Sequence, residues 1–295
     1  MQPEILIQLL VSGLLMGFIF SLIAVGLNLI YGVMDIVNFA HGDYLMLSMY
    51  TAFWLYTLWG VDPLFSLPVC IVLLFVIGWV TYQLIIKRIL KAPMLAQIFS
   101  TFGLMVFLRN AALMAFTSDY RAVGESLVTG RIGIGGVFIP TPQLVASVGA
   151  ILTTGAIYWF IHRTEMGMAL MATAEDAEAA SLMGINSDRM YALAWGLGAA
   201  CVGVAGALLS TFYYIFPEVG YLFGLLAYVI VALGGFGSIT GAFIAGIIVG
   251  VVEVLFGWAL SSLWTERALA YKYAFVYLIY LIVVIVRPRG LLGTR

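Results

Sequence analysis

The chain has 295 residues, of which 64% are hydrophobic and 9% are charged, with a formal net charge of −1 and a mean hydropathy of +1.12. A soluble domain carries about 25% charged residues, so this composition excludes the soluble globular class and indicates a polytopic α-helical membrane protein. The long unbroken apolar runs also exclude a transmembrane β-barrel, whose strands alternate between apolar and polar residues. A net charge near zero gives no indication of nucleic acid or another polyanionic partner.

A transmembrane helix needs about 20 mostly apolar residues. On that scale the sequence predicts an all-α fold with eight to nine spans, forming one membrane domain over residues 1–295. The second and seventh spans are the least regular, because they are short and are flanked by glycine or polar residues. The candidate spans lie near 5–31, 44–60, 65–86, 94–117, 143–161, 190–213, 220–238, 241–261 and 271–287.

Lysine and arginine in short loops indicate the cytoplasmic side of a membrane protein. In a nine-span chain the basic clusters fall on one side, which places the amino terminus outside, in the periplasm, and the carboxyl terminus in the cytoplasm. Segment 118–142 is rich in glycine and polar residues and becomes an external loop, although it carries Arg121 and Arg131. The clusters are Lys87, Arg88 and Lys91, then Arg163, then Arg287, Arg289 and Arg295.

A hydrophilic segment at 163–189 interrupts the apolar pattern and predicts a short helix in water, from about 174 to 183. Thr173 and Asp176 have the spacing of a capping box, and Gly184 supplies a stop. The first turn is acidic, and one face carries small side chains. A helix of about ten residues is not stable alone in water, so it must dock on a soluble partner or on its own bundle. The residues expected at this contact are Thr173, Glu175, Asp176, Ala177, Glu178, Ala180, Ser181, Met183 and Gly184.

Two further interruptions combine polar residues with glycine. Polar, non-helical backbone at membrane depth is tolerated only against protein or a water-filled cavity, so both predict broken helices that line or gate a pathway. The alternatives are a cytoplasmic loop with helix caps for the first and a tight turn for the second. If both line the pathway, we expect them to meet. The candidate residues are Asp35, Asn38, His41 and Asp43 in the first, and Gly234, Gly235 and Gly237 in the second.

Charged residues inside spans usually face the bundle interior and are paired. Arg109 and Glu253 are such residues. They could pair with each other, but we expect Arg109 to extend outward to the membrane surface, because it lies in the outer half of its span. The rest of the pathway is expected to be small and apolar, without strong fixed charges.

The sequence shows no means of catalysis. No lysine follows a glycine in the pattern of a phosphate-binding loop, so we expect no ATP hydrolysis by this chain and no bound cofactor. Cys70 and Cys201 lie in apolar runs and, with only two histidines, predict neither a disulfide framework nor a metal site. No nucleophile and base can be paired, so an enzyme is not expected.

Several motifs together carry a family resemblance. In order along residues 8 to 293, they resemble the inner-membrane permeases of bacterial branched-chain amino acid ABC importers, and most closely the first of the two paired permease subunits. They are NLIYG and IVNFAHG within 28–42, GLMVFLRN at 103–110, AED and ASLMGINSDR within 174–189, LGGFGSITGA at 233–242, and the ending RP and GLLG within 287–293.

The resemblance implies a half-transporter in the bacterial inner membrane that pairs with a second, related permease, as a heterodimer rather than a homodimer. It also implies two cytoplasmic ATPase subunits, which use the ATP, and a periplasmic solute-binding protein. Segment 173–186 matches the coupling helix, which in that family lies in a groove on an ATPase. Met171 and Asp43 depart from the family pattern, in which arginine and glutamate are common at these positions.

Two alternatives remain open from the sequence. Permeases for urea and short-chain amides share the same motifs, so the cargo is not determined. An ion-coupled secondary transporter or channel would use Asp35, His41, Asp43 and Glu253 as an ion path. The predicted coupling helix favours the ATP-driven importer, because a secondary transporter has no need of one.

Overall fold

The computed structural model describes residues 3–124, 126–263, 272–287 and 290–292, most of which are helical. A two-stranded antiparallel hairpin, β1 (Arg131–Ile134) and β2 (Val137–Pro140), is the exception to the expected all-α fold. The helices are α1 (Pro3–Met34), α2 (His41–Trp59), α3 (Pro63–Thr81), the π-helix η1 (Tyr82–Ile86), α4 (Lys87–Ile89), α5 (Met94–Phe116), α6 (Thr141–Arg163), α7 (Glu165–Glu175), α8 (Ala177–Leu182), α9 (Ser187–Leu209), α10 (Val219–Gly234), α11 (Ile239–Leu263) and α12 (Lys272–Val286).

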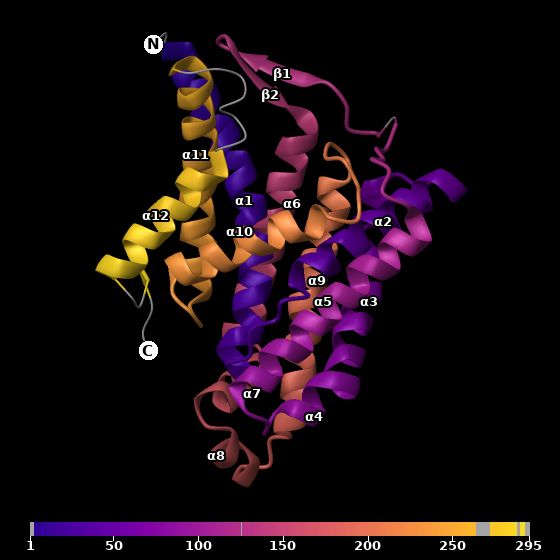
Figure 1. Ribbon diagram of the computed structural model, residues 1–295, viewed down its shortest axis with the longest axis vertical. Helices are drawn as coiled ribbons and strands as arrows, with labels where there is room; N and C mark the ends of the chain where they lie inside the picture. The colour runs from indigo at the N-terminus through magenta and orange to yellow at the C-terminus, as the bar shows by residue number, and fades with distance from the viewer. Residues whose placement is uncertain (1–2, 125, 264–271, 288–289, 293–295) are drawn as a thin grey trace.

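Six of the described helices are long and apolar enough to cross a membrane: α1, α3 with its continuation to Ile89, α5, α6, α9 and α11. They correspond to the first, third, fourth, fifth, sixth and eighth predicted spans. Helices α10 and α12 are apolar but shorter, and α2, which starts with two polar side chains, does not reach the same apolarity. In Figure 1, α10 lies across the long helices rather than along them. The prediction of a polytopic helical membrane protein with broken segments is confirmed.

Local sequence explains where these helices begin and end. Asp62 caps α3, because its side chain accepts a hydrogen bond from the Leu64 N–H at 2.9 Å, and Pro63 occupies the first helical position. Gly60 ends α2 in the left-handed region, with φ 65°, and donates its N–H to carbonyls of the last turn. These two residues make the tight connection between α2 and α3.

Helix α9 forms the centre of the bundle, with most of its residues buried, and packs against α1, α2, α3 and α6. Its glycines allow this close packing. A Cβ atom on Gly198 would lie 2.6 Å from the Gly26 carbonyl oxygen of α1, and one on Gly206 would lie 2.7 Å from the Leu45 carbonyl oxygen of α2. The small residues of α9 therefore form a helix-packing surface.

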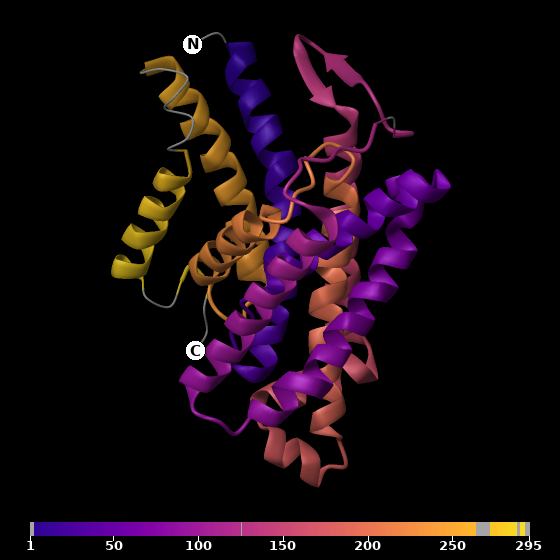
Figure 2. The same cartoon turned by 45° about the vertical axis from the view of Figure 1, so that its right-hand side comes forward.

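The two ends of the bundle differ in construction. At one end, the β1–β2 hairpin lies beside the start of α1 (Figure 1), where the Gln8 side chain donates to the Phe138 carbonyl at 2.7 Å and accepts from its N–H at 2.6 Å. At the opposite end lie α4, α7 and α8. Figure 2 shows the same separation from a second direction. The hydrophilic segment 163–189 thus lies at one end of the helical bundle.

Candidate functional site

The end of α1, just before the first interruption, contacts the glycine-rich second interruption. The side chain of Asn28 on α1 reaches the connection between α10 and α11, where its Oδ1 accepts from the Gly237 N–H at 2.7 Å and its Nδ2 donates to the Ser238 carbonyl at 2.8 Å. The rings of Tyr31 and Phe236 lie 4.5 Å apart, centroid to centroid. The end of α1 is therefore fixed directly to the glycine turn.

A cavity of about 320 Å³ opens where these segments meet. Asp35 borders it, at the point where the chain leaves α1 with a left-handed backbone (φ 54°), a conformation that is uncommon for a residue other than glycine. Helix α7 closes another side with Met171 and Glu175, and Gly237 belongs to the lining as well. The cavity thus connects the glycine turn to the hydrophilic segment, and it is the part of the structure that best fits the predicted gate.

Asn38 and His41 are both fully buried, so the alternative of a loop with helix caps does not place them in bulk solvent. His41 places its Nε2 atom 2.9 Å from the Ile23 carbonyl oxygen of α1, and Tyr228 of α10 donates its hydroxyl to the Asn38 carbonyl. Neither residue lines the cavity beside Asp35. Their contacts join α1, α2 and α10, which indicates a packing role.

Gly234 and Gly235 form a second junction rather than a surface of the cavity. The segment 290–292 crosses the end of α10, where the Leu291 N–H donates to the Leu233 carbonyl at 2.8 Å and the Leu292 N–H donates to the Gly234 carbonyl at 3.0 Å. Gly290 adopts φ 76°, and a Cβ there would lie 2.6 Å from the Gly235 nitrogen. The last carbonyls of α10 therefore find their donors in a distant part of the chain.

Arg109 pairs with Asp43 inside the bundle, so the expectation that it extends outward to the membrane surface is wrong, and so is the alternative of a pair with Glu253. Its Nε and Nη2 atoms lie 3.4 and 3.5 Å from the two carboxylate oxygens of Asp43, and its guanidinium lies 5.2 Å from the centre of the Tyr221 ring. The expectation of a pathway without strong fixed charges stays a prediction, because this pair borders a cavity that is not identified as the pathway. The first turn of α2 brings Asp43 within reach of α5, which spacing in the sequence could not reveal.

Glu253 has a different environment. It is buried on α11, and Tyr213, Tyr273 and Tyr277 lie close to its carboxyl group. Asp35, His41, Asp43 and Glu253 consequently do not line one cavity within the described residues. This separation gives no support to the alternative of an ion path through those four groups.

The hydrophilic segment contains two short helices instead of the single one expected from 174 to 183. Thr173 is not a cap; it is buried within α7, and its hydroxyl donates to the Ala169 carbonyl at 2.8 Å. The cap is Asp176, whose Oδ1 accepts from the N–H groups of Glu178 and Ala179 at 2.9 and 3.0 Å. The helix stop at Gly184 is confirmed, with φ 86°.

The small side chains expected on one face of the helix, Ala177, Ala180 and Ser181, are divided between two environments. Ala180 is only 5% exposed and Ala177 is half-buried, so these two pack on the chain itself, whereas Ser181 is exposed. The outward side instead presents Glu178 and Ser181, followed by Leu182 and Met183, which are 84% and 83% exposed. Two exposed apolar side chains next to an acidic group therefore replace the predicted alanine face.

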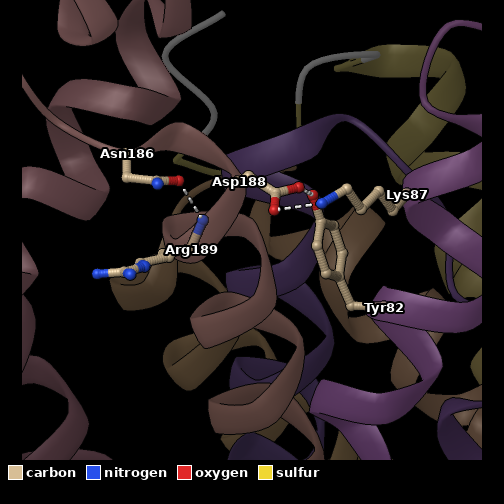
Figure 3. Close-up of polar contacts among 5 residues, drawn as sticks. All are labelled: Tyr82, Lys87, Asn186, Asp188 and Arg189. Carbon is tan, nitrogen blue, oxygen red and sulfur yellow. Dashed lines mark hydrogen bonds and ion pairs between the residues drawn. The ribbon is translucent and has the colours of Figure 1, made fainter.

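A polar junction ties this segment to the bundle (Figure 3). The Asp188 carboxylate accepts a hydrogen bond from the Tyr82 hydroxyl at 2.7 Å and pairs with the Lys87 ammonium at 2.7 Å. Asn186 caps α9 by accepting from the Arg189 N–H at 3.0 Å. The chain that leaves α8 is thus joined to η1, α4 and α9 within a few residues.

Sequence reasoning missed Asn28, Tyr82 and Asp188 as site residues. A polar side chain inside an apolar span is a recognisable signal, so Asn28 could have been selected. Tyr82 and Asp188 are 106 positions apart, and nothing in the sequence links them.

The chain matches a family model described as "Branched-chain amino acid transport system / permease component" over residues 9–284. It is 34% identical to the high-affinity branched-chain amino acid transport system permease protein BraD of Pseudomonas aeruginosa, with 99% of this chain and 98% of that protein covered. It is 33% identical to LivH of Escherichia coli, with 97% and 95% covered. Among solved structures, PsaBC from Streptococcus pneumoniae has a similar fold, with a TM-score of 0.51 at 12% identity over 94% of this chain and 91% of that one.

Proposed function

Because the chain belongs to the family of branched-chain amino acid transport permease components, we propose that it is the membrane-spanning subunit of an ATP-driven importer for branched-chain amino acids. The relatives carry that cargo in their names and match this chain along almost its full length. Urea or short-chain amides are the competing cargo. The proposal includes a second permease subunit, two ATPase subunits on the cytoplasmic side and a solute-binding protein in the periplasm.

The observation that carries this proposal is the outward side of α8. Leu182 and Met183 project from the end of the bundle, and Asp176 and Gly184 fix the ends of the helix that bears them. Exposed apolar side chains on a short, capped helix in water are suited to a groove on a soluble protein, since they would lose contact with water there. We therefore assign the ATPase contact to Glu178, Leu182 and Met183, in place of the buried Ala180.

Force applied to α8 has a direct way into the bundle. Asp188 connects the chain just after α8 to Tyr82 and Lys87, and α9 then runs through the centre of the fold. Helix α7 enters the same segment from the other side and closes the cavity next to Asp35 and Gly237. Movement of a docked ATPase would thus reach both the central helix and the gate cavity.

The same arrangement supports an orientation. Lys87, Arg88 and Arg163 belong to α4 and the last turn of α6, at or near the end that carries α8, which we assign to the cytoplasm. The start of α1 and the β1–β2 hairpin then face the periplasm. Segment 290–292 packs against the last residues of α10, Leu233 and Gly234, in keeping with a cytoplasmic carboxyl terminus in the bacterial inner membrane.

The proposal is tested by importing leucine with the assembled complex while α8 is altered. We expect Leu182→Asp combined with Met183→Asp to abolish leucine uptake and to prevent co-purification of the ATPase, because a charge would have to be buried in the groove. The fold should be retained, since both side chains are in water. Leu127→Asp is the matched control for ATPase binding, because Leu127 is 68% exposed on the external loop.

Two outcomes would refute the proposal. Full uptake and ATPase binding by the double variant would remove α8 as the coupling element. Import of urea but not leucine by the unaltered complex would replace the cargo.

A further inference from the structure

A second cavity, of about 170 Å³, lies between α2, α5 and α10. Asp43 and Arg109 form its polar side, and Phe39, Phe102, Met105 and Leu225 are among its apolar lining. Pockets for drug-sized ligands measure about 300–1,000 Å³, so this space is of a size for a much smaller solute. This cavity therefore combines a small volume with one acidic and one basic group on the same side.

The ion pair between Asp43 and Arg109 beside this cavity is longer than a strong one. A strong carboxylate–guanidinium contact measures about 2.7–2.9 Å, whereas Arg109 approaches Asp43 only to 3.4 and 3.5 Å. The Asp43 side chain is 1% exposed and the Arg109 side chain 20% exposed. The carboxylate is thus fixed and enclosed, while the guanidinium has room to move.

The neighbours of Arg109 allow its guanidinium to move away from Asp43. Its guanidinium lies over the Tyr221 ring, which attracts the cation and retains part of its stabilisation when Asp43 is released. Helix α5, which carries Arg109, has only two buried residues, Thr101 and Ala112, whereas α2 is held by close glycine contacts to α10. Arg109 is therefore on the loosely packed side of the cavity and Asp43 on the rigid side.

The depth of the pair matters as well. Arg109 is seven residues from the end of α5 at Phe116, which corresponds to roughly 10 Å along the helix axis. A charge at that depth is costly unless it is paired, and such charges typically mark a solute pathway. The same arrangement suits a solute that brings one charge of each sign.

We propose that Asp43 and Arg109, with the cavity beside them, bind a zwitterionic aliphatic α-amino acid during its passage. The solute's ammonium group would replace the guanidinium at Asp43, and its carboxylate would accept both N–H groups of Arg109. Its side chain would contact Phe39, Phe102 and Leu225. Urea, which is neutral, would leave the ion pair closed and gain nothing from it.

This proposal deepens the proposed function, on which it rests, by giving a physical basis for the choice of cargo. The binding must be weak, because a solute that is held tightly inside a pathway leaves slowly. The loose contact meets this condition, since the solute exchanges one set of ionic hydrogen bonds for another.

The test uses the importer assembled with its partner subunits in detergent, without the solute-binding protein. Binding of radiolabelled leucine is measured by scintillation proximity, with leucinamide, 4-methylpentanoate and urea as competitors. We expect saturable leucine binding that unlabelled leucine displaces far better than the three competitors, of which two lack one charged group and urea lacks both.

Three variants separate recognition from packing. Asp43→Asn combined with Arg109→Gln removes both charges and so leaves no unpaired one, and we expect leucine binding to weaken at least about tenfold in an assembled complex. Arg109→Lys keeps the charge but loses the planar fork, so binding should weaken severalfold even if the double variant fails to assemble. Arg121→Gln is the control, because Arg121 also lies over aromatic rings but outside this cavity, and it should bind leucine as the unaltered chain does.

The outcomes are distinct from those of the importer proposal. Absence of saturable binding by the unaltered complex, or unaltered binding and discrimination in Arg109→Lys or in an assembled double variant, would overturn the recognition site. Leucine uptake by the unaltered importer with its solute-binding protein would leave the proposed function in place in either case.

Discussion

Replacement of Gly42 by alanine tests whether the crossing of α2 and α10 is as close as the structure shows. A Cβ atom at Gly42 would lie 1.9 Å from the Gly220 carbonyl oxygen and 2.9 Å from the Gly224 Cα atom. Ordinary Cβ contacts begin near 3.4 Å, so the two backbones would have to separate by roughly 1.5 Å. No side-chain rotation can relieve the contact, because both obstructing atoms belong to the backbone.

The cost of Gly42→Ala can be compared with its benefit. Overpacking a closed interior costs about 1–3 kcal/mol, with backbone clashes at the upper end. Alanine favours a helix over glycine by about 1 kcal/mol, which offsets only part of that. A net loss of about 2 kcal/mol corresponds to a melting temperature lower by roughly 5 °C, measured by thermal unfolding of the purified chain in detergent.

Gly103→Ala is the control for Gly42→Ala. Gly103 lies in α5, and a Cβ there meets nothing within 4 Å, so the helix preference of alanine should appear alone as an unchanged or slightly raised melting temperature. Uptake should also fall in Gly42→Ala, because the next residue, Asp43, would move away from Arg109. Equal melting temperatures for the two variants would refute the close crossing.

Two further predictions concern the cytoplasmic end. Asp188→Ala should cost about 1–3 kcal/mol of stability and lower the leucine imported per ATP hydrolysed, because the buried Tyr82 hydroxyl loses its acceptor. Asp188→Asn keeps an acceptor for Tyr82 and loses only the half-exposed ion pair with Lys87, which is worth less than about 1 kcal/mol. If Asp188→Ala and Asp188→Asn lost stability and transport equally, the effect would belong to the ion pair with Lys87 and not to the hydrogen bond from Tyr82. In intact cells, Ser181→Cys should resist a membrane-impermeant thiol reagent that labels Leu127→Cys; the reverse pattern would invert the proposed orientation.

The sequence predicted those parts of the fold that depend on local composition. Apolar runs of sufficient length placed the six full-length spans to within a few residues. The stop at Gly184 was also correct, because a left-handed backbone after a helix favours glycine. Each of these features is determined by residues that are neighbours in the chain.

The errors have a common physical origin. Thr173 and Asp176 have the spacing of a capping box, but burial of Thr173 within α7 left Asp176 to cap a second helix. Arg109 was expected at the membrane surface because its partner, Asp43, is 66 residues earlier and belongs to another helix. The orientation of α8 likewise depends on which face its own bundle covers. Tertiary contacts decide such features, and periodicity in a single sequence does not contain them.

The junction of segment 290–292 with α10 has a consequence for biogenesis. The carbonyls of Leu233 and Gly234 accept hydrogen bonds from the N–H groups of Leu291 and Leu292, which the ribosome adds 58 residues later. During synthesis, these two carbonyls therefore lack the donors that they have in the finished fold until that segment has emerged. A chain interrupted before Leu291 would leave the end of α10 without these two hydrogen bonds, and we expect it to be more open to proteolysis there.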